Sequence, residues 1–425
     1  MSRYRWFVVF TFFLFILLHQ ADKLLIGPLT TPIMETFRIN EAQMGAVFTG
    51  ALVVGAVCYW LWGWLYDRFV RTRLLALAAL IWGATTWLAA VVRTFPGFVI
   101  SRAATGIDDA SYPGLYNVIA DYFEPQKRGK VNAIMELAMP LGYLGGMILA
   151  MSMVNSVGWR GVFYITGSVG VALAVLIFFG VKEPRRGASE PELRGIEQKK
   201  EYRFEWKKVR GLFKKRSLIL IYCQSLFGVF PWQVITYWFF RYLETERGYS
   251  QNQVMLTMGI AIIVLAGGYP IGGALGDAWF KRNPRGRLLV SAIGVALGAV
   301  LLVFALRTPV ANRLQFGLLL GLTALFIPIA APNMVTSVYD VTVPEVRSTA
   351  NGVFNFFDSI GAAISPLLAG LIALRSSLGN AILLISVGAW ALCFVFILVA
   401  SFFMPEDVKA LRQIMGERAA AEKAA

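Results

Sequence analysis

Long apolar stretches alternate with short polar connections along the whole chain. Cutting the apolar runs at charged clusters gives twelve segments, each long enough to cross a bilayer as a helix: 6–33, 42–65, 74–92, 98–122, 131–154, 161–181, 217–242, 254–276, 288–306, 314–338, 349–373 and 380–403. We expect helices, because a lipid-facing backbone must satisfy its N–H and C=O groups internally, and the runs lack the strict alternation of a membrane barrel. The pattern therefore predicts an all-α membrane protein with twelve transmembrane helices.

Composition and the placement of charge support this prediction. Hydrophobic residues make up 57% of the 425 residues and charged residues 15%, which excludes an ordinary soluble enzyme, a coiled coil or a disordered chain. Of the 40 lysines and arginines, 30 fall in the connections on the side of the two termini and seven in the opposite connections. The positive-inside rule then predicts cytoplasmic termini in a bacterial-type inner (plasma) membrane. Topology accounts for the net charge of +15, so no nucleic acid partner is expected.

The chain is predicted to consist of two related halves. The longest polar connection, 182–216, carries 13 basic residues and separates six apolar segments from six. Two echoes relate the halves: Gly-x-Leu-x-Asp closes the second segment of each, and an Arg-xxx-Asn pattern recurs 219 residues later, at Arg128 and Arg347. The predicted domains are residues 1–181 and 217–404, each a six-helix bundle, with a basic cytoplasmic loop at 182–216 and a cytoplasmic tail at 405–425.

The loop after the second segment carries a family resemblance. GWLYDRFVRTRLL, residues 63–75, is similar to the G-x-L-x-D-R-x-G-R-R loop of the major facilitator superfamily. The resemblance implies two six-helix bundles with the solute bound between them at the midplane. It also implies a cytoplasmic gate, because a carboxylate at a helix end can dock on another helix terminus and separate when the halves rock. The alternative is that these charges only set the topology. The predicted gate residues are Gly63, Asp67, Arg68, Arg71, Gly273 and Asp277.

A finer resemblance is to the spinster-like branch of that superfamily. The segment RAATGIDDA, residues 102–110, is similar to the branch's R-x-x-x-G-I-G-E-A, with Asp108 in place of glycine and Asp109 in place of glutamate. The pair Asp22-Lys23 resembles its Asp-Arg pair in the first helix. The resemblance implies a lysophospholipid or a phosphorylated sphingoid lipid as solute. Organic-anion symporters of the superfamily carry a similar acidic-basic pair.

Ionisable residues inside the apolar segments are the main functional candidates, because they are costly at membrane depth. A regular helix would place Arg102 and Asp109 on one face of the fourth segment, and Asp22 lies at a depth where it could meet Arg102. Our hypothesis is that Asp22 and Asp109 exchange protons while Arg102 alternates between them and an anionic solute. A static ion pair that fixes helix packing is the alternative. We expect His19 to be a packed or cavity-lining residue rather than a proton relay.

Predicted solute contacts come from both halves. The seventh segment is rich in aromatic residues, which membrane-interface belts would explain in part. In the eleventh segment three polar residues follow an i, i+4, i+7 spacing, which polar contacts between helices would explain equally well. The candidates are Lys23, Arg102, Asp108, Trp232, Gln233, Tyr237, Asn351, Asn355 and Asp358.

Together these features predict a proton-coupled secondary transporter that works by alternating access and moves an amphipathic or organic anion, a lysophospholipid-like solute included. The alternatives are an organic anion:cation symporter for small carboxylates, an efflux carrier for drugs or metabolites, and a sensor that moves no solute. The sequence shows no phosphate-binding loop and no His/Cys cluster, so we expect no enzyme activity, no metal and no cofactor. The expected partners are the solute, protons and membrane lipids, and the expected state is a monomer.

Overall fold

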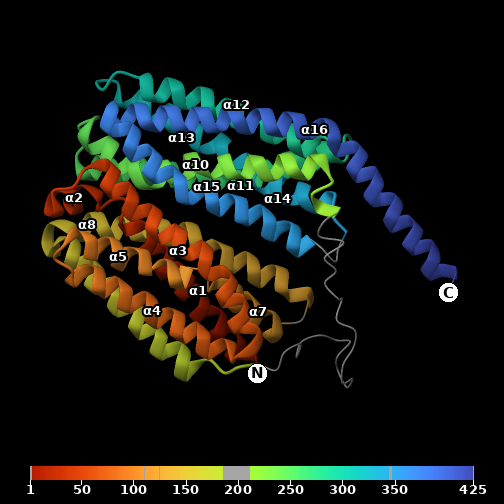
Figure 1. Ribbon diagram of the computed structural model, residues 1–425, viewed down its shortest axis with the longest axis horizontal. Helices are drawn as coiled ribbons and strands as arrows, with labels where there is room; N and C mark the ends of the chain where they lie inside the picture. The colour runs from red at the N-terminus through yellow and green to blue at the C-terminus, as the bar shows by residue number, and fades with distance from the viewer. Residues whose placement is uncertain (1, 110, 124, 185–210, 344–346, 425) are drawn as a thin grey trace. The chain divides into compact units, whose positions relative to one another are not determined.

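The computed structural model in Figure 1 describes residues 2–109, 111–123, 125–184, 211–343 and 347–424. Within these ranges the regular elements are helices and no strand occurs, which confirms the all-α prediction. Contacts divide the chain into two compact units. Unit 1 comprises Met1–Lys200, Thr236–Met255 and Pro366–Arg375; unit 2 comprises Glu201–Ile235, Leu256–Ser365 and Ser376–Ala425. The predicted domain boundaries at 181 and 217 stay a prediction.

The helices in the first part of the chain are α1 (Ser2–Leu25), α2 (Thr30–Phe37), α3 (Glu41–Arg68), α4 (Arg71–Val91), α5 (Phe95–Ala104), α6 (Gly106–Asp109), α7 (Tyr112–Tyr122) and α8 (Pro125–Gly180). Those in the second part are α10 (Arg216–Thr245), α11 (Gln251–Phe280), α12 (Gly286–Arg307), α13 (Arg313–Phe326), the 3-10 turn η2 (Ile327–Ile329), α14 (Ala330–Asp340), α15 (Arg347–Arg375) and α16 (Leu378–Ala424). The ends of α10 and α15 belong to unit 1.

Ten helical stretches in the described part of the chain are long and apolar enough to span a membrane. They account for the twelve predicted segments with two adjustments. The fifth and sixth segments are merged in α8, which turns at Gly158 with φ 69°. The fourth is divided among α5, α6 and α7. The predicted tail continues α16 as helix through residue 424 (Figure 1).

The first segment was predicted as one span, and the structure divides it into α1 and α2. Gly27 and Pro28 lie in the break, where proline removes a backbone donor and restricts the residue before it. Glycine is also needed for close packing, because a Cβ at Gly27 would lie 2.7 Å from the carbonyl oxygen of Thr236 in α10. The break thus lets the two backbones approach within unit 1.

The fourth segment also departs from a regular helix. The N–H of Thr105 bonds to the carbonyl of Arg102 three residues earlier, and the chain turns again after Asp109 before α7 begins. Arg102 in α5 and Asp109 in α6 therefore do not belong to one regular helix as predicted, although both line the cavity described below.

Each unit has an apolar core of its own. In unit 1 the core joins side chains of α1, α3, α4, α7 and α8, and in unit 2 it joins α10, α12, α14, α15 and α16. Small residues allow the closest helix–helix contacts. Such contacts matter in a membrane, because the hydrophobic effect does not drive helices together in lipid. A Cβ at Gly83 of α4 would lie 2.7 Å from the carbonyl oxygen of Gly167 of α8. Large apolar side chains such as Phe179 and Leu314 are 78% exposed, which suits a lipid-facing surface.

Candidate functional site

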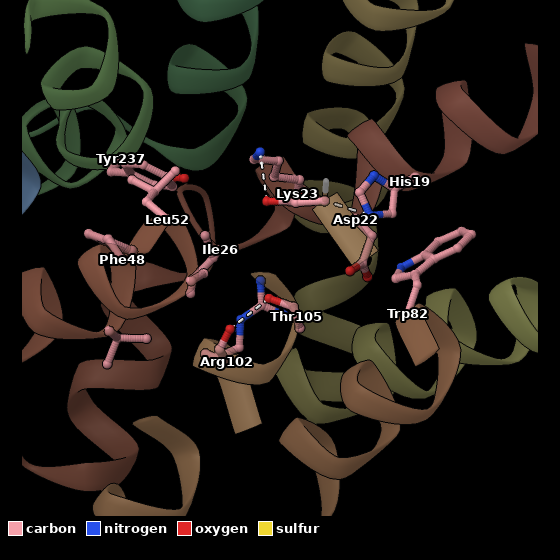
Figure 2. A pocket seen from close by; sticks show the side chains of 13 residues that line it. His19, Asp22, Lys23, Ile26, Phe48, Leu52, Trp82, Arg102, Thr105 and Tyr237 are labelled. Carbon is pink, nitrogen blue, oxygen red and sulfur yellow. Dashed lines mark hydrogen bonds and ion pairs between the residues drawn. The ribbon is translucent and has the colours of Figure 1, made fainter. Parts of the chain in front are cut away.

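A small cavity within unit 1 collects most of the ionisable residues predicted in the first half (Figure 2). The space open to the centre of a water molecule is about 20 Å³, enough for about one water and too small for an organic solute. The lining residues are His19, Asp22, Lys23, Ile26, Val47, Phe48, Ala51, Leu52, Trp82, Arg102, Thr105, Asp109 and Tyr237.

One ion pair crosses the cavity between α1 and α6. Lys23 Nζ lies 2.9 Å from Asp109 Oδ2, and the Lys23 side chain is 31% exposed against 13% for Asp109. The sequence predicted Arg102 as the counter-charge of Asp109, and the structure instead gives it Lys23. Asp109 lies in the short helix α6, between the breaks that separate it from α5 and α7.

Asp22 is buried on α1 and is held by two hydroxyl groups. Thr86 of α4 donates to Asp22 Oδ2 at 3.1 Å, and Thr166 of α8 donates to Asp22 Oδ1 at 2.6 Å. Among the described residues Asp22 has no ion-pair partner, so the predicted meeting with Arg102 does not occur in this state. Both residues do line the same cavity. The threonines escaped the sequence analysis because a threonine in an apolar run is usually bonded to its own helix.

Arg102 is 4% exposed and points toward the cavity with unused donors. Its guanidinium carbon lies 5.4 Å from the centre of the Phe163 ring, a cation–π contact. Its Nε and Nη1 atoms find no hydrogen-bond acceptor in the described part of the chain. A buried arginine with free N–H groups is ready to bind an anion.

A second polar cluster, which the sequence analysis did not predict, adjoins the cavity around His19. Its Nε2 lies 2.5 Å from Asp108 Oδ2 and 3.6 Å from Asp109 Oδ1. Its Nδ1 hydrogen-bonds to the hydroxyl of Tyr112, which also accepts from Gln20 Nε2 at 2.9 Å. His19 therefore lines the cavity, as expected, but it is bonded at both nitrogens. The available signal was that this is the chain's single histidine.

The second half contributes one predicted residue to the cavity wall. Tyr237 of α10 is buried and stacks on Phe48, with ring centres 4.4 Å apart. This end of α10 belongs to unit 1, where Arg241 Nη2 lies 3.0 Å from Glu41 Oε1 and Glu244 accepts a hydrogen bond from Thr31 at 2.6 Å. These contacts hold Tyr237 in place.

The other predicted solute contacts lie in unit 2. Trp232 and Gln233 of α10 are partly buried. On α15, Asn351 has an Oδ1 atom that is buried without a partner in the described part, Asn355 is exposed, and Asp358 is partly buried. Their role as solute contacts stays a prediction.

The predicted gate residues form pairs within each unit. Arg71 bonds to Asp121 and to Glu183, both at 2.7 Å, within unit 1. Arg287 contacts Asp277 at 2.7 Å and also Asp340, within unit 2.

The remaining gate candidates are Arg68, Gly273, Gly63 and Asp67. Arg68 is exposed, with its guanidinium 4.7 Å from the centre of the Trp64 ring, and a Cβ at Gly273 would lie 4.0 Å from Pro332 Cβ. The side chains of Gly63 and Asp67 lie outside the described residues. A gate function stays a prediction.

The comparisons with known proteins agree with this fold. The sequence model of the Major Facilitator Superfamily matches residues 11–314. Protein spinster of Drosophila melanogaster is 27% identical over 88% of this chain, which spans 62% of that relative's length. The probable galactarate/D-glucarate transporter GudP of Bacillus subtilis (strain 168) is 25% identical, over 93% of this chain and 91% of the relative.

Among solved structures, a bacterial homolog to the human lysosomal transporter Spinster, in an inward-facing and unoccupied conformation, superposes with a TM-score of 0.85. That match is 18% identical and covers 96% of this chain and 99% of the other, so it shows the fold alone. The family match over more than half of the sequence, with the helical fold, shows that the chain belongs to the major facilitator superfamily of membrane transporters and resembles its spinster-like members.

Proposed function

We propose that the chain is a secondary transporter of an organic anion, driven by protons, that works by alternating access from a bacterial-type inner membrane with both termini in the cytoplasm. The observation that carries the proposal is the buried Arg102, whose Nε and Nη1 have no acceptor in the described part of the chain. A buried cation with unused donors supports a site for an anionic group. D-glucarate, which the name of the Bacillus relative gives as its solute, is a suitable first probe.

Proton coupling follows from competition for the cations. Lys23 neutralises Asp109 in the described state. An anionic solute that binds Arg102 and draws Lys23 away leaves Asp109 without its counter-ion, which favours its protonated form. The solute and the proton would then be carried together. When the halves rock, both are released on the other side, and Asp67, Arg68, Arg71, Gly63, Gly273 and Asp277 are proposed to form the gate.

A lysophospholipid-like solute is the second candidate, and one feature favours it. The cavity wall is apolar opposite the charges, with Ile26, Phe48 and Leu52 beside Tyr237. An amphipathic anion could place its headgroup near Arg102 and its chain along these residues. A small organic anion without an apolar chain would contact only the charged residues of the cavity.

The test uses the purified full chain in liposomes with an imposed pH gradient. D-glucarate and an anionic lysophospholipid are the two solutes, and internal pH is recorded together with uptake. We expect gradient-driven accumulation of one of them by the wild type. Asp109→Asn and Arg102→Gln should each lower it about tenfold or more, since a hydrogen bond to a charged group contributes roughly 1.5–3 kcal/mol.

The matched control is Arg375→Gln, the same substitution at an exposed arginine of α15, which should behave as wild type. Accumulation that is equal with and without the pH gradient would contradict proton coupling. Binding of a solute without any flux would instead favour the sensor alternative.

A further inference from the structure

The cluster around His19 is not used by the proposed mechanism, although it adjoins the same cavity. The side chains of His19 and Asp108 are 4% and 0% exposed, so this hydrogen-bonded pair is cut off from solvent. Asp108 stands where the resembled spinster-like segment has glycine. The pair is therefore an addition to the chemistry that the resemblance implies.

A charge count shows that the region is one proton short of neutrality. With a neutral His19, the described side chains in and beside the cavity carry two positive charges, on Lys23 and Arg102. They carry three negative charges, on Asp22, Asp108 and Asp109. A net buried charge is costly in a membrane interior. One proton on His19 removes it.

His19 can gain this proton while each of its hydrogen bonds keeps a donor and an acceptor. In the neutral form Nε2–H of His19 donates to Asp108, the Tyr112 hydroxyl donates to Nδ1, and Gln20 Nε2 donates to the Tyr112 oxygen. The added proton goes to Nδ1, which then donates to the Tyr112 oxygen. The hydroxyl hydrogen of Tyr112 then points away from His19 and needs another acceptor.

Gln20 offers that acceptor. Its Oε1 atom is buried and has no hydrogen-bond partner in the described part of the chain. Rotation of the amide exchanges its nitrogen and oxygen, so that the oxygen accepts from Tyr112. The chain from His19 through Tyr112 to Gln20 is thus complete in either direction.

The other groups around the cluster do not replace this proton. Lys23 Nζ is already bound to Asp109, and an ammonium at that point also opposes a metal ion held by His19, Asp108 and Asp109. Trp82 of α4 packs edge-on to the imidazole, with ring centres 5.3 Å apart, and carries no charge. The titratable groups that face the cluster from the packed elements are Cys58 of α3, Arg102 of α5, Asp108 and Asp109 of α6, Tyr112 of α7, Tyr143 of α8 and Tyr237 of α10.

We infer that His19, with Asp108 as its counter-ion and a hydrogen-bond chain through Tyr112 to Gln20, is a proton-binding site in addition to Asp109. The histidine binds and releases one proton while Asp108 stays ionised. Its contribution to transport rests on the proposed function and adds a second proton to each cycle. Proton binding itself does not depend on which solute is carried.

The first test exploits the single histidine. The full chain, labelled with ¹³C and ¹⁵N at histidine only, gives one imidazole in magnetic resonance spectra, so no assignment is needed. We expect the wild-type imidazole to pass from imidazolium to the neutral form with Nε2 protonated between about pH 5 and 9. In Asp108→Asn, which removes the counter-ion, it should stay neutral throughout. Asp407→Asn, the same change in α16 of unit 2, should titrate as wild type.

An imidazole that keeps one protonation state across the range in the wild type overturns the inference, whether that state is neutral or charged. Failure of Asp108→Asn to fold would leave this wild-type titration as the deciding measurement.

The second test measures proton and D-glucarate flux in liposomes for the wild type and His19→Gln. We expect the number of protons per solute to fall by one in the variant, with solute flux retained at low pH. A histidine that titrates while the ratio is unchanged would overturn its part in transport. If no D-glucarate moves at all, the proposed solute fails, and the spectroscopic titration still decides the proton site.

Discussion

The fourth apolar segment of each half is a broken helix, but the two segments carry different residues at the break. At the 219-residue offset, Asp121 matches Asp340, and each pairs with an arginine at the start of the third helix of its half, Arg71 or Arg287. The helix is broken in both copies, near Thr105 in the first and at η2 in the second. The fold therefore repeats both the terminal ion pair and the break.

The charges beyond the break are not repeated. At the same offset, Arg102, Asp108 and Asp109 correspond to Gly321, Ile327 and Pro328. An irregular helix inside a membrane needs support from neighbours, which both halves supply by packing. In the first half, Arg102 and Asp109 on either side of the break line one cavity. The helix break is therefore duplicated, whereas these ionisable residues are not duplicated at the 219-residue offset.

The largest effect should come from removing the arginine of the duplicated ion pair. Arg71 is 5% exposed and bonded to two carboxylates, so Arg71→Ala should lower the free energy of unfolding by about 3–5 kcal/mol, as breaking a buried pair does. Arg287→Ala should cost less, because its partner Asp277 is 61% exposed. Chemical unfolding in detergent micelles measures both. Equal costs would show that the two pairs are energetically equivalent despite their different exposure.

A smaller effect is expected where helices touch through glycine. At Gly83 a Cβ meets backbone atoms, Gly167 O at 2.7 Å and Val171 N at 2.8 Å, which cannot move aside. At Gly298 the closest atom it meets is in the side chain of Ile327, at 2.1 Å, which can turn, and the backbone N of Ile327 is 3.7 Å away. Gly83→Ala should therefore destabilise by about 1–3 kcal/mol and Gly298→Ala by less. Thermal unfolding of the two variants ranks them, and the reverse order would contradict the packing argument.

The smallest effect is a pH dependence confined to the second half. Burial holds the pKa of Lys215, just before α10, below its ordinary value of 10.5, against the opposing influence of Asp407. Between the lowered pKa and 10.5 the unfolded residue binds more protons, so the free energy of unfolding rises with pH in that window. The start of α1 carries Arg3 rather than a lysine. Unfolding at pH 9 and 10.5 should differ less in Lys215→Met than in wild type; an unchanged difference would rule Lys215 out.

The sequence predicted the helical class and the positions of the apolar segments, because the requirement to satisfy the backbone in lipid leaves few solutions. It also singled out Asp22, Lys23, Arg102 and Asp109, all of which line one cavity, because an ion in an apolar run is conspicuous. The sequence did not predict the correct partners of these ions. The prediction assumed a regular helix through Thr105, and a helix break changes which neighbouring helix a side chain faces.

The sequence by itself determined that the chain lies in lipid, how many apolar segments it has, that its two halves are related, and which ionisable residues lie in apolar segments. Each of these depends on composition and on spacing along the chain. Only the tertiary structure decided that Asp109 pairs with Lys23, that Asp22 is held by Thr86 and Thr166, and that His19 joins Asp108. Those contacts connect residues 64 to 144 positions apart, across helices whose breaks set their direction. Periodicity within one helix carries no information about such a neighbour.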